Sequence, residues 1–347
     1  MKAVTITDAR RVELVDRAIP EPAGRRVVVR VEAAPLCGSD LRLLYRLPGR
    51  KPFVPGHEGA GTVVAVRGAL TVKEGYRVCV INPRISCGTC EMCRRGYPLY
   101  CDNDEGMHGF TVDGWQAEYA LVDERTLRRV PDWMHLEEAS LLLDPVGTPL
   151  HALERAGARA PCTIGIFGLG PMGLGAVSVA VFLGCRVLAA DPNPVRRALA
   201  KSLGAAEIFD GRGGDAAAAM RAAAGRGGLD VALECSGNPA AFLTALELLR
   251  PLGRLSLIGE CEEATFSPSA HVLRKELTIF GSTCFPEPVF GRAIALCERG
   301  LDPRRIVTHR LPLENAAEAY DMFDNGLTGK VVLTGAAAAT GAVACGR

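Results

Sequence analysis

The hydrophobic pattern changes twice along the chain and divides it into three zones. Up to about Leu143, short apolar runs rich in Val are broken by Gly and Pro, which predicts a β-rich zone. From about Thr163, fully apolar strands alternate with Ala- and Leu-rich helical stretches, a pattern typical of βαβ units around a parallel sheet. After about Pro286 the pattern is again a mixture of helical and strand-like segments. The pattern therefore predicts an α/β fold, with a β-rich domain and a doubly wound parallel-sheet domain.

Within these zones the periodicity places individual elements. The β-rich zone is expected to hold strands at Met1–Arg10, Arg26–Glu32, Gly61–Val66 and Arg77–Ile81. The parallel sheet is expected to consist of strands Thr163–Phe167, Arg186–Ala190, Val231–Cys235, Leu255–Gly259 and Leu277–Gly281, with helices such as Leu174–Leu183 and Arg196–Leu203. The chain should end in helices Val289–Arg299 and Leu313–Phe323, strand Lys330–Thr334 and a frayed Ala- and Gly-rich tail, Ala336–Arg347.

Composition narrows the classes of function. The 40 Lys and Arg residues nearly balance 39 Asp and Glu residues, so the formal net charge is only +1. Nucleic acids and membrane surfaces usually select a basic face, so neither is expected as a partner. The chain has no uncharged apolar run of membrane-spanning length, and its first ten residues do not resemble an export signal. A cytoplasmic protein is the expectation.

A glycine motif follows the first strand of the parallel zone. The run Gly168-Leu169-Gly170-Pro171-Met172-Gly173 opens a helix, which is the setting in which GxGxxG binds the pyrophosphate of a dinucleotide. Asp191 ends the next strand, where a carboxylate accepts hydrogen bonds from the adenosine ribose and repels a 2′-phosphate. The sequence therefore favours NAD over NADP. Arg196 and Arg197 either line the adenosine or accept a 2′-phosphate, and the alternative for the motif is a Gly-rich turn of another α/β protein.

Four of the thirteen cysteines are clustered in one loop, at Cys87, Cys90, Cys93 and Cys101. Their spacing lets four thiolates surround one tetrahedral Zn²⁺. Because all four positions would be filled, the role is structural: the metal holds a lobe, residues 84–104, that is too small to have its own core. The alternatives are an iron–sulfur cluster, whose usual spacings differ, and two disulfides, which a cytoplasmic protein would not keep.

Two further motifs lie in the β-rich zone, Cys37-Gly38-Ser39-Asp40 and Gly56-His57-Glu58-x-x-Gly61. With the glycine motif and the cysteine cluster, they make the chain from Lys2 to about Gly335 resemble the zinc-dependent medium-chain dehydrogenases of the alcohol dehydrogenase superfamily. The resemblance implies a GroES-like catalytic domain at 1–148 and a Rossmann NAD-binding domain at 149–286. It also implies a return to the catalytic domain at 287–335, before the tail 336–347.

Other segments resemble the L-threonine and polyol (sorbitol-type) dehydrogenases within that superfamily. The run Asp144-Pro145-Val146-Gly147-Thr148-Pro149-Leu150-His151 is similar to Asp-Pro-x-Gly-x-x-x-His of the threonine enzymes. The stretches Gly300–Asp302, Ile306–Arg310 and Gly329–Val331 are similar to that branch as well. Other alcohol dehydrogenases have a Cys near the position of Asp144, so the carboxylate indicates the threonine and polyol branch.

The resemblance also implies roles for single residues. Cys37 and His57 would hold one catalytic zinc per chain, Glu58 would be a third ligand or a carboxylate behind the ligands, and Asp144 would lie beside the metal. Ser39 would take the proton of the substrate hydroxyl and pass it to the nicotinamide ribose, whereas Asp40 would orient a zinc ligand or a nearby backbone group. The residues expected to line the cofactor are Met172, Ile258, Gly259, Glu260, Ser282 and Thr283, with Lys330 at the pyrophosphate.

Three positions depart from the family pattern. Gly75-Tyr76-Arg77-Val78 replaces Gly-Asp-Arg-Val, and a glycine expected at Arg67 is displaced to Gly68. Both changes concern turns. Arg42 replaces a proton-relaying His, and a guanidinium has no lone pair with which to accept a proton. The proton then leaves through water, and Arg42 either belongs to a solvated basic loop or contacts an anionic group of cofactor or substrate.

The sequence thus predicts an NAD- and zinc-dependent dehydrogenase that oxidises a secondary alcohol to a ketone. Its substrate would be a polyol, a cyclitol or sugar-like compound, or an amino alcohol such as threonine. The alternatives are an NADPH-dependent carbonyl reductase of the same fold, which Asp191 opposes, and an inactive NAD- and zinc-binding module, which the complete set of metal residues opposes. The expected partners are the small alcohol or ketone and further copies of the chain, in a homodimer or homotetramer.

Overall fold

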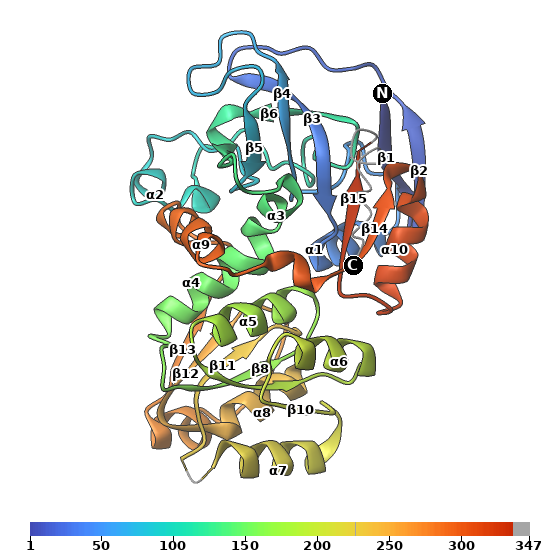
Figure 1. Ribbon diagram of the computed structural model, residues 1–347. Helices are drawn as coiled ribbons and strands as arrows, with labels where there is room; N and C mark the ends of the chain where they lie inside the picture. Colours follow the sequence, from blue (N-terminus) through green and yellow to red (C-terminus); the bar gives the residue numbers. More distant parts are fainter. Residues whose placement is uncertain (226, 336–347) are drawn as a thin grey trace, which may run out of the picture. The chain divides into compact units, whose positions relative to one another are not determined.

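The computed structural model describes residues 1–225 and 227–335, which form two units (Figure 1). Unit 1 comprises Met1–Leu143, Pro286–Pro288 and the described residues from Val307 onward, whereas unit 2 comprises Asp144–Phe285 and Val289–Ile306. The sequence predicts that the chain returns to the first domain at residue 287. Val289–Ile306 belongs to unit 2, where Arg292 makes two hydrogen bonds of 2.6 and 2.7 Å to the carboxylate of Glu154. The predicted tail lies outside the described residues.

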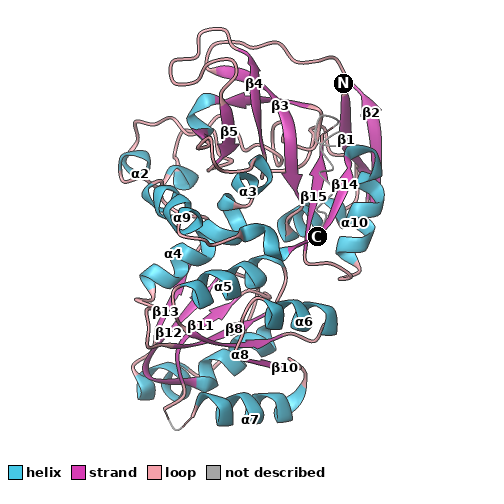
Figure 2. Cartoon of the chain, in the orientation of Figure 1, coloured by secondary structure: helices cyan, strands magenta, loops and turns pink. Residues whose placement is uncertain are grey.

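Unit 1 is rich in antiparallel strands (Figure 2). Strands β1 and β2 form a two-stranded sheet, and a larger sheet has the order β14-β15-β3-β4-β5-β7, with β6 also paired to β3. The pair β14–β15 is parallel, and the other pairs are antiparallel. The strands are β1 (Lys2–Asp8), β2 (Arg11–Asp16), β3 (Arg26–Pro35), β4 (Ala60–Ala65), β5 (Arg77–Val80), β6 (Tyr119–Asp123), β7 (Leu127–Arg129), β14 (Val307–Pro312) and β15 (Lys330–Thr334). The helices are α1 (Gly38–Asp40), α2 (Glu91–Arg94), α3 (Leu136–Ser140) and α10 (Ala316–Asp324).

Strand β3 is the centre of this sheet because its sequence suits burial on both faces. Val27, Val28 and Val29 are all buried, and β-branched side chains fit a pleated surface with neighbours on each side. The strand pairs with β4, β6 and β15. It ends at Pro35, two residues before Cys37, so the best-anchored strand of unit 1 leads directly into the first candidate metal ligand.

Unit 2 contains a parallel sheet of six strands in the order β10-β9-β8-β11-β12-β13. In Figure 1, α5 and α6 lie on one face of this sheet and α7 and α8 on the other. The strands are β8 (Thr163–Phe167), β9 (Arg186–Ala190), β10 (Glu207–Phe209), β11 (Leu229–Glu234), β12 (Leu249–Leu257) and β13 (Thr278–Gly281). The helices are α4 (Thr148–Arg155), α5 (Pro171–Phe182), α6 (Pro194–Ser202), α7 (Gly213–Ala224), α8 (Pro239–Leu248) and α9 (Pro288–Glu298).

Short turns of other helix types complete both units. The π-helical turns are Leu41–Tyr45, Leu142–Gly147 and Pro268–Val272, and the 3₁₀ turns are Pro98–Tyr100, Glu124–Thr126, Leu273–Lys275, Pro303–Ile306 and Leu313–Asn315. Among the described residues, no helix combines the length and the apolar composition that a membrane crossing requires.

The predicted fold class, a β-rich domain and a doubly wound parallel-sheet domain, is confirmed. Strands Thr163–Phe167, Arg186–Ala190 and Lys330–Thr334 have the predicted bounds. Strand β12 differs, since it begins at Leu249 and ends before Gly259. Pro251 and Gly253 in its first half are typical turn residues, and here the pairing with β11 shifts register between Leu249 and Arg254, with Leu252 at a positive φ of 63°.

Candidate active site

The carboxylate of Asp40 joins the two metal motifs of unit 1. Asp40 is the last residue of α1 and is fully buried. Its Oδ2 accepts the backbone N–H of Cys37 at 2.9 Å, and its Oδ1 lies 3.1 Å from Nδ1 of His57. One side chain thus sets both the backbone of the candidate thiolate ligand and the ring of the candidate imidazole ligand.

The segment that carries His57 and Glu58 is clamped by tight backbone packing. Trp115 donates its backbone N–H to the carbonyl of Gly56 at 2.9 Å, and its ring lies over Gly59. A Cβ atom at Gly59 would be 2.3 Å from this ring, so only glycine fits. Trp115 is fully buried, which leaves the His57 loop little freedom to move.

Glu58 pairs with a lysine far away in the sequence. The Lys330 ammonium donates to Oε1 of Glu58 at 2.5 Å, and both side chains are completely buried. Two charges without water are stable only when they are paired, so each residue requires the other. Lys330 was expected at the pyrophosphate of the cofactor. In the structure its ammonium donates to Glu58.

Four side chains offer one metal-ligand atom each: Cys37, His57, Glu58 and Asp144. These atoms all lie within 4.8 Å of one another. Asp144 directly follows Leu143, at the residue where the chain passes from one unit to the other, and lies in the π-helical turn Leu142–Gly147. One sulfur, one imidazole nitrogen and carboxylate oxygens form a donor set that suits Zn²⁺. Residues from three separate sequence motifs therefore meet as a candidate metal centre.

Ser39 and Arg42 accompany Cys37 in the chain. Ser39 is half-buried in α1, one residue before Asp40. Arg42 lies half-buried in the π-helical turn Leu41–Tyr45. Arg46 follows this turn and bonds Asp324 of α10 at 2.7 Å, so the segment that carries Arg42 is fixed at its end. The basic segment that contains Arg42 and Arg46 is therefore partly ordered by an ion pair and is not uniformly solvated.

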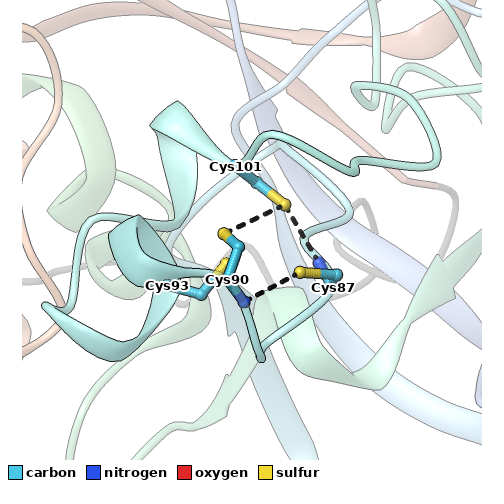
Figure 3. Close-up of side chains that lie close together, drawn as sticks. All are labelled: Cys87, Cys90, Cys93 and Cys101. Carbon is cyan, nitrogen blue, oxygen red and sulfur yellow. Dashed lines mark hydrogen bonds between the residues drawn. The ribbon is translucent and has the colours of Figure 1, made fainter.

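The cysteine cluster forms a second candidate metal centre. Cys87, Cys90, Cys93 and Cys101 point toward one another, with sulfur atoms within 4.8 Å (Figure 3). Backbone N–H groups donate to these sulfurs, including Cys90 to Cys87 at 3.3 Å and Cys87 to Cys101 at 3.2 Å. The Thr89 hydroxyl and the backbone N–H groups of Thr89 and Cys90 lower the pKa of the Cys87 thiol to about 5. Donors of this kind stabilise thiolates, which are the form that binds zinc.

The glycine motif has the geometry of a dinucleotide loop. It connects β8 to α5, and Gly170 is the N-cap of this helix. A Cβ atom at Gly173 would be 1.8 Å from the carbonyl oxygen of Gly168, so a side chain there would break the turn. The first N–H groups of α5 point out of the helix end, where they favour a phosphate.

Asp191 lies against this loop and is already hydrogen-bonded. Its Oδ2 accepts the N–H of Leu169 at 2.6 Å and its Oδ1 accepts the N–H of Asn193 at 2.7 Å. A carboxylate has about four acceptor positions, so two remain for ribose hydroxyls. Burial lowers the pKa of the nearby Arg196, an effect that the charge of Asp191 opposes. Arg197 donates to the carbonyl groups of Asp191 and Pro192.

The other predicted cofactor residues follow the ends of parallel strands. Ile258, Gly259 and Glu260 come after β12, and Ser282 and Thr283 come after β13. The carboxyl ends of parallel strands lie at one edge of a sheet, so this edge also carries Gly168 and Asp191. The hydroxyl of Ser282 is buried and makes no hydrogen bond among the described residues, which leaves it available to a ligand.

Sequence reasoning missed the turn after β11. Glu234 accepts the backbone N–H of Ser236 at 2.8 Å and that of Gly237 at 3.0 Å, and its own carbonyl accepts those of Ile258 and Gly259 at 2.8 Å. Burial raises the pKa of Glu234 even though these donors lower it. Ser236 packs on Gly168, where an added Cβ would be 2.6 Å away. The sequence did contain a signal for this turn: Glu234 ends an apolar strand and is followed closely by Ser236 and Gly237.

Comparison with known families gives matches over most of the chain. Residues 23–132 match the model for an alcohol dehydrogenase GroES-like domain, and residues 171–299 match that for a zinc-binding dehydrogenase. An uncharacterised zinc-type alcohol dehydrogenase-like protein of Escherichia coli K12, YphC, is 33% identical and aligns over 93% of this chain and 95% of its own length. The sorbitol dehydrogenase of Bacillus subtilis is 31% identical (92% and 93%), and the L-threonine 3-dehydrogenase of Pyrococcus horikoshii is 31% identical (92% and 94%).

Solved structures of similar proteins superpose on almost the whole chain. The alcohol dehydrogenase from Thermus sp. ATN1 has a TM-score of 0.87 and 33% identity, covering 96% of this chain and 99% of its own. Galactitol-1-phosphate dehydrogenase from Escherichia coli has a TM-score of 0.85 and 30% identity, with 96% and 100% covered. An alcohol dehydrogenase (rspB) from E. coli CFT073, solved with NADH, has a TM-score of 0.85 and 27% identity, with 96% and 99% covered.

Proposed function

This chain belongs to the zinc-dependent alcohol dehydrogenase family, as its motifs predicted, and on that premise we propose that it oxidises a secondary alcohol to a ketone and transfers the hydride to NAD. As a member of the family it is an oxidoreductase that acts on CH–OH groups. The observation that carries the proposal is the group of Cys37, His57, Glu58 and Asp144, whose ligand atoms lie within 4.8 Å of one another.

The residues at this centre fit a catalytic zinc. Cys37 and His57 would ligate it, and Glu58 or Asp144 would supply a carboxylate oxygen. When bound, zinc supplies Lewis acidity that lowers the pKa of an alcohol hydroxyl. Asp40 would keep the proton of His57 on Nδ1, so that Nε2 is the ligand atom. The ammonium of Lys330 would limit the negative charge that Glu58 brings to the metal.

Ser39 is the proposed acceptor of the substrate proton. Its hydroxyl lies one residue from Asp40 and two from Cys37, and it would pass the proton to the nicotinamide ribose. In the family a His usually continues this route, but Arg42 stands in its place. We propose that the proton continues through water, because a guanidinium cannot accept it.

NAD is the proposed cofactor. The carboxylate of Asp191 lies within hydrogen-bonding distance of the glycine loop, where it would bind both ribose hydroxyls and repel the 2′-phosphate of NADP. The similar alcohol dehydrogenase solved with NADH supports this choice. The clustered thiolates of Cys87, Cys90, Cys93 and Cys101 would hold a second, structural zinc in a site without an open position.

The proposed substrate is a polyol, a cyclitol or sugar-like alcohol, or an amino alcohol. The similarity to a sorbitol dehydrogenase, a galactitol-1-phosphate dehydrogenase and L-threonine 3-dehydrogenases supports this range. The guanidinium of Arg42 would bind the phosphate of a phosphorylated polyol. As the family resemblance implies, the chain would act as a homodimer or homotetramer.

A screen of NAD reduction, combined with metal analysis, tests the proposal. The zinc-loaded protein is assayed with sorbitol, galactitol 1-phosphate, inositol and L-threonine, each with NAD and with NADP, and with the corresponding ketones and NADH or NADPH. We expect turnover on at least one of these alcohols, preference for NAD and two zinc ions per chain. Turnover only with NADPH and a ketone would identify a carbonyl reductase. One zinc per chain with no turnover on any compound would instead identify an inactive binding module.

A further inference from the structure

Two cysteines outside both metal centres lie next to each other at the amino edge of the parallel sheet. Cys162 precedes β8 and Cys185 precedes β9, two adjacent parallel strands whose register pairs Thr163 with Arg186. The residues one position earlier, Cys162 and Cys185, are therefore neighbours across the two strands. The hydrogen bonding between the two strands extends to these cysteines, because Arg186 donates its backbone N–H to the carbonyl of Cys162 at 2.8 Å.

This placement meets the geometric requirement of a disulfide. Neighbouring strands lie roughly 4.7–4.9 Å apart, and residues in register point to the same face of a sheet. Disulfides join residues whose Cα atoms are about 4.4–6.8 Å apart. Cys162 is half-buried and therefore partly exposed to solvent, whereas Cys185 is buried.

The local environment keeps both thiols protonated. Burial, the charge of Asp230 and the neighbouring Cys185 raise the pKa of Cys162 to about 12, and burial also raises the pKa of Cys185. Since the thiolate is the reactive form, the pair reacts slowly and remains reduced while thiols dominate the surroundings. The two thiols nevertheless affect each other's pKa, which is consistent with their register.

We infer that Cys162 and Cys185 are a modification site that closes to a disulfide on exposure to a small disulfide such as oxidised glutathione. The thiolate of the accessible Cys162 attacks one sulfur of the oxidant and releases one glutathione thiolate. The thiolate of Cys185 then attacks the Cys162 sulfur of the mixed disulfide and releases the second. The two protons of the protein thiols end on two glutathione molecules, so excess reduced glutathione reverses the reaction.

The disulfide would connect the amino ends of the two strands that carry the dinucleotide residues. Strand β8 continues into Gly168, and β9 continues into Asp191. The closed segment contains the whole of α5, so the bond would restrain the unit that presents the glycine loop. Because the strands are already hydrogen-bonded, we expect the bond to stabilise this unit against unfolding and to leave the cofactor edge nearly unchanged.

The sequence offers a direct test, because Lys and Arg are absent between Arg159 and Arg186. Trypsin therefore releases residues 160–186 as one peptide that contains Cys162, Cys185 and no other cysteine. The folded, zinc-loaded protein is incubated in glutathione buffers of increasing oxidised fraction, alkylated and digested. We expect a peptide that has lost two hydrogens and carries no alkyl group. It should revert with excess reduced glutathione and should not form in Cys162→Ser or Cys185→Ser.

The Cys261→Ser variant is the matched control, since Cys261 is a half-buried cysteine of the same unit with no expected role, and it should behave like the natural sequence. A doubly alkylated peptide in every buffer would overturn the inference. So would a glutathione adduct on Cys162 that never proceeds to the internal disulfide, or a disulfide that forms only after the protein has been unfolded in urea.

Discussion

Nδ1 of His57 lies 3.1 Å from Oδ1 of Asp40, and both side chains are buried. The same carboxylate bonds the backbone of Cys37, so Asp40 orients two proposed zinc ligands without being one of them. Asp40→Asn keeps the shape and removes the charge that holds the imidazole. We expect zinc affinity at this centre to fall about 10- to 100-fold. Metal titration with a chromophoric chelator measures this zinc affinity.

Asp132→Asn is the control for this change, because Asp132 is an exposed aspartate of the same unit. It should leave both zinc affinities unchanged. If Asp40→Asn binds zinc as tightly as the control does, Asp40 has no positioning role.

The cysteine cluster is expected to contribute stability and not turnover. Cys90→Ser removes one of four thiolates, so we expect one zinc to be lost and the unfolding temperature to fall by about 5 °C or more. The remaining zinc should still support turnover at a temperature where the variant is folded. Calorimetry with metal analysis checks both. Unchanged zinc content and unchanged unfolding would contradict a metal at this cluster.

Asp191 is expected to determine the choice of cofactor. Asp191→Ala removes the carboxylate that would bind the ribose, and it also removes the acceptor of the Leu169 and Asn193 N–H groups. We expect the dissociation constant of NAD to rise about tenfold or more and the preference over NADP to shrink. Fluorescence titration with both cofactors measures this. Asp215→Ala, at an exposed aspartate of α7, should have no effect, and an unchanged ratio in Asp191→Ala would refute the assignment.

The buried pair of Glu58 and Lys330 is expected to matter for folding. Lys330→Met leaves the Glu58 carboxylate buried without its ammonium partner, which costs about 3–5 kcal/mol in comparable pairs. Urea unfolding of the zinc-loaded protein measures the loss. Lys2→Met removes the exposed pair with Asp16 and should have little effect, because water screens both charges. A loss for Lys330→Met no larger than that of the control would show that the pair is dispensable.

A contact of Arg42 with an anionic group of substrate or cofactor is the alternative to a solvated basic loop, and kinetics distinguish the two. For Arg42→Gln we expect one Michaelis constant to rise about 10- to 150-fold, as for a lost bidentate contact. Kinetics with saturating NAD, and separately with saturating substrate, identify the partner. Arg50→Gln, an exposed arginine of the same stretch, should change neither constant. Two unchanged constants in Arg42→Gln would leave it as surface charge.

The sequence by itself determined the features that depend on residues close together in the chain. The glycine motif, the four clustered cysteines and the strand–helix alternation are each set by local spacing and periodicity, because a turn, a metal loop or a βαβ unit is built from neighbouring residues. The family could be identified from these motifs, and with it the fold class of each part.

Only the tertiary structure decided the pairings between distant residues. The ammonium of Lys330 donates to Glu58, and Val289–Ile306 belongs to the second unit. Neither of these follows from spacing, because a long-range contact depends on the path of the whole chain and on which buried charge finds a partner. For the same reason the role of Glu234 could not be predicted. Its carboxylate accepts hydrogen bonds from the turn after β11, and the parallel sheet places this turn against Gly168.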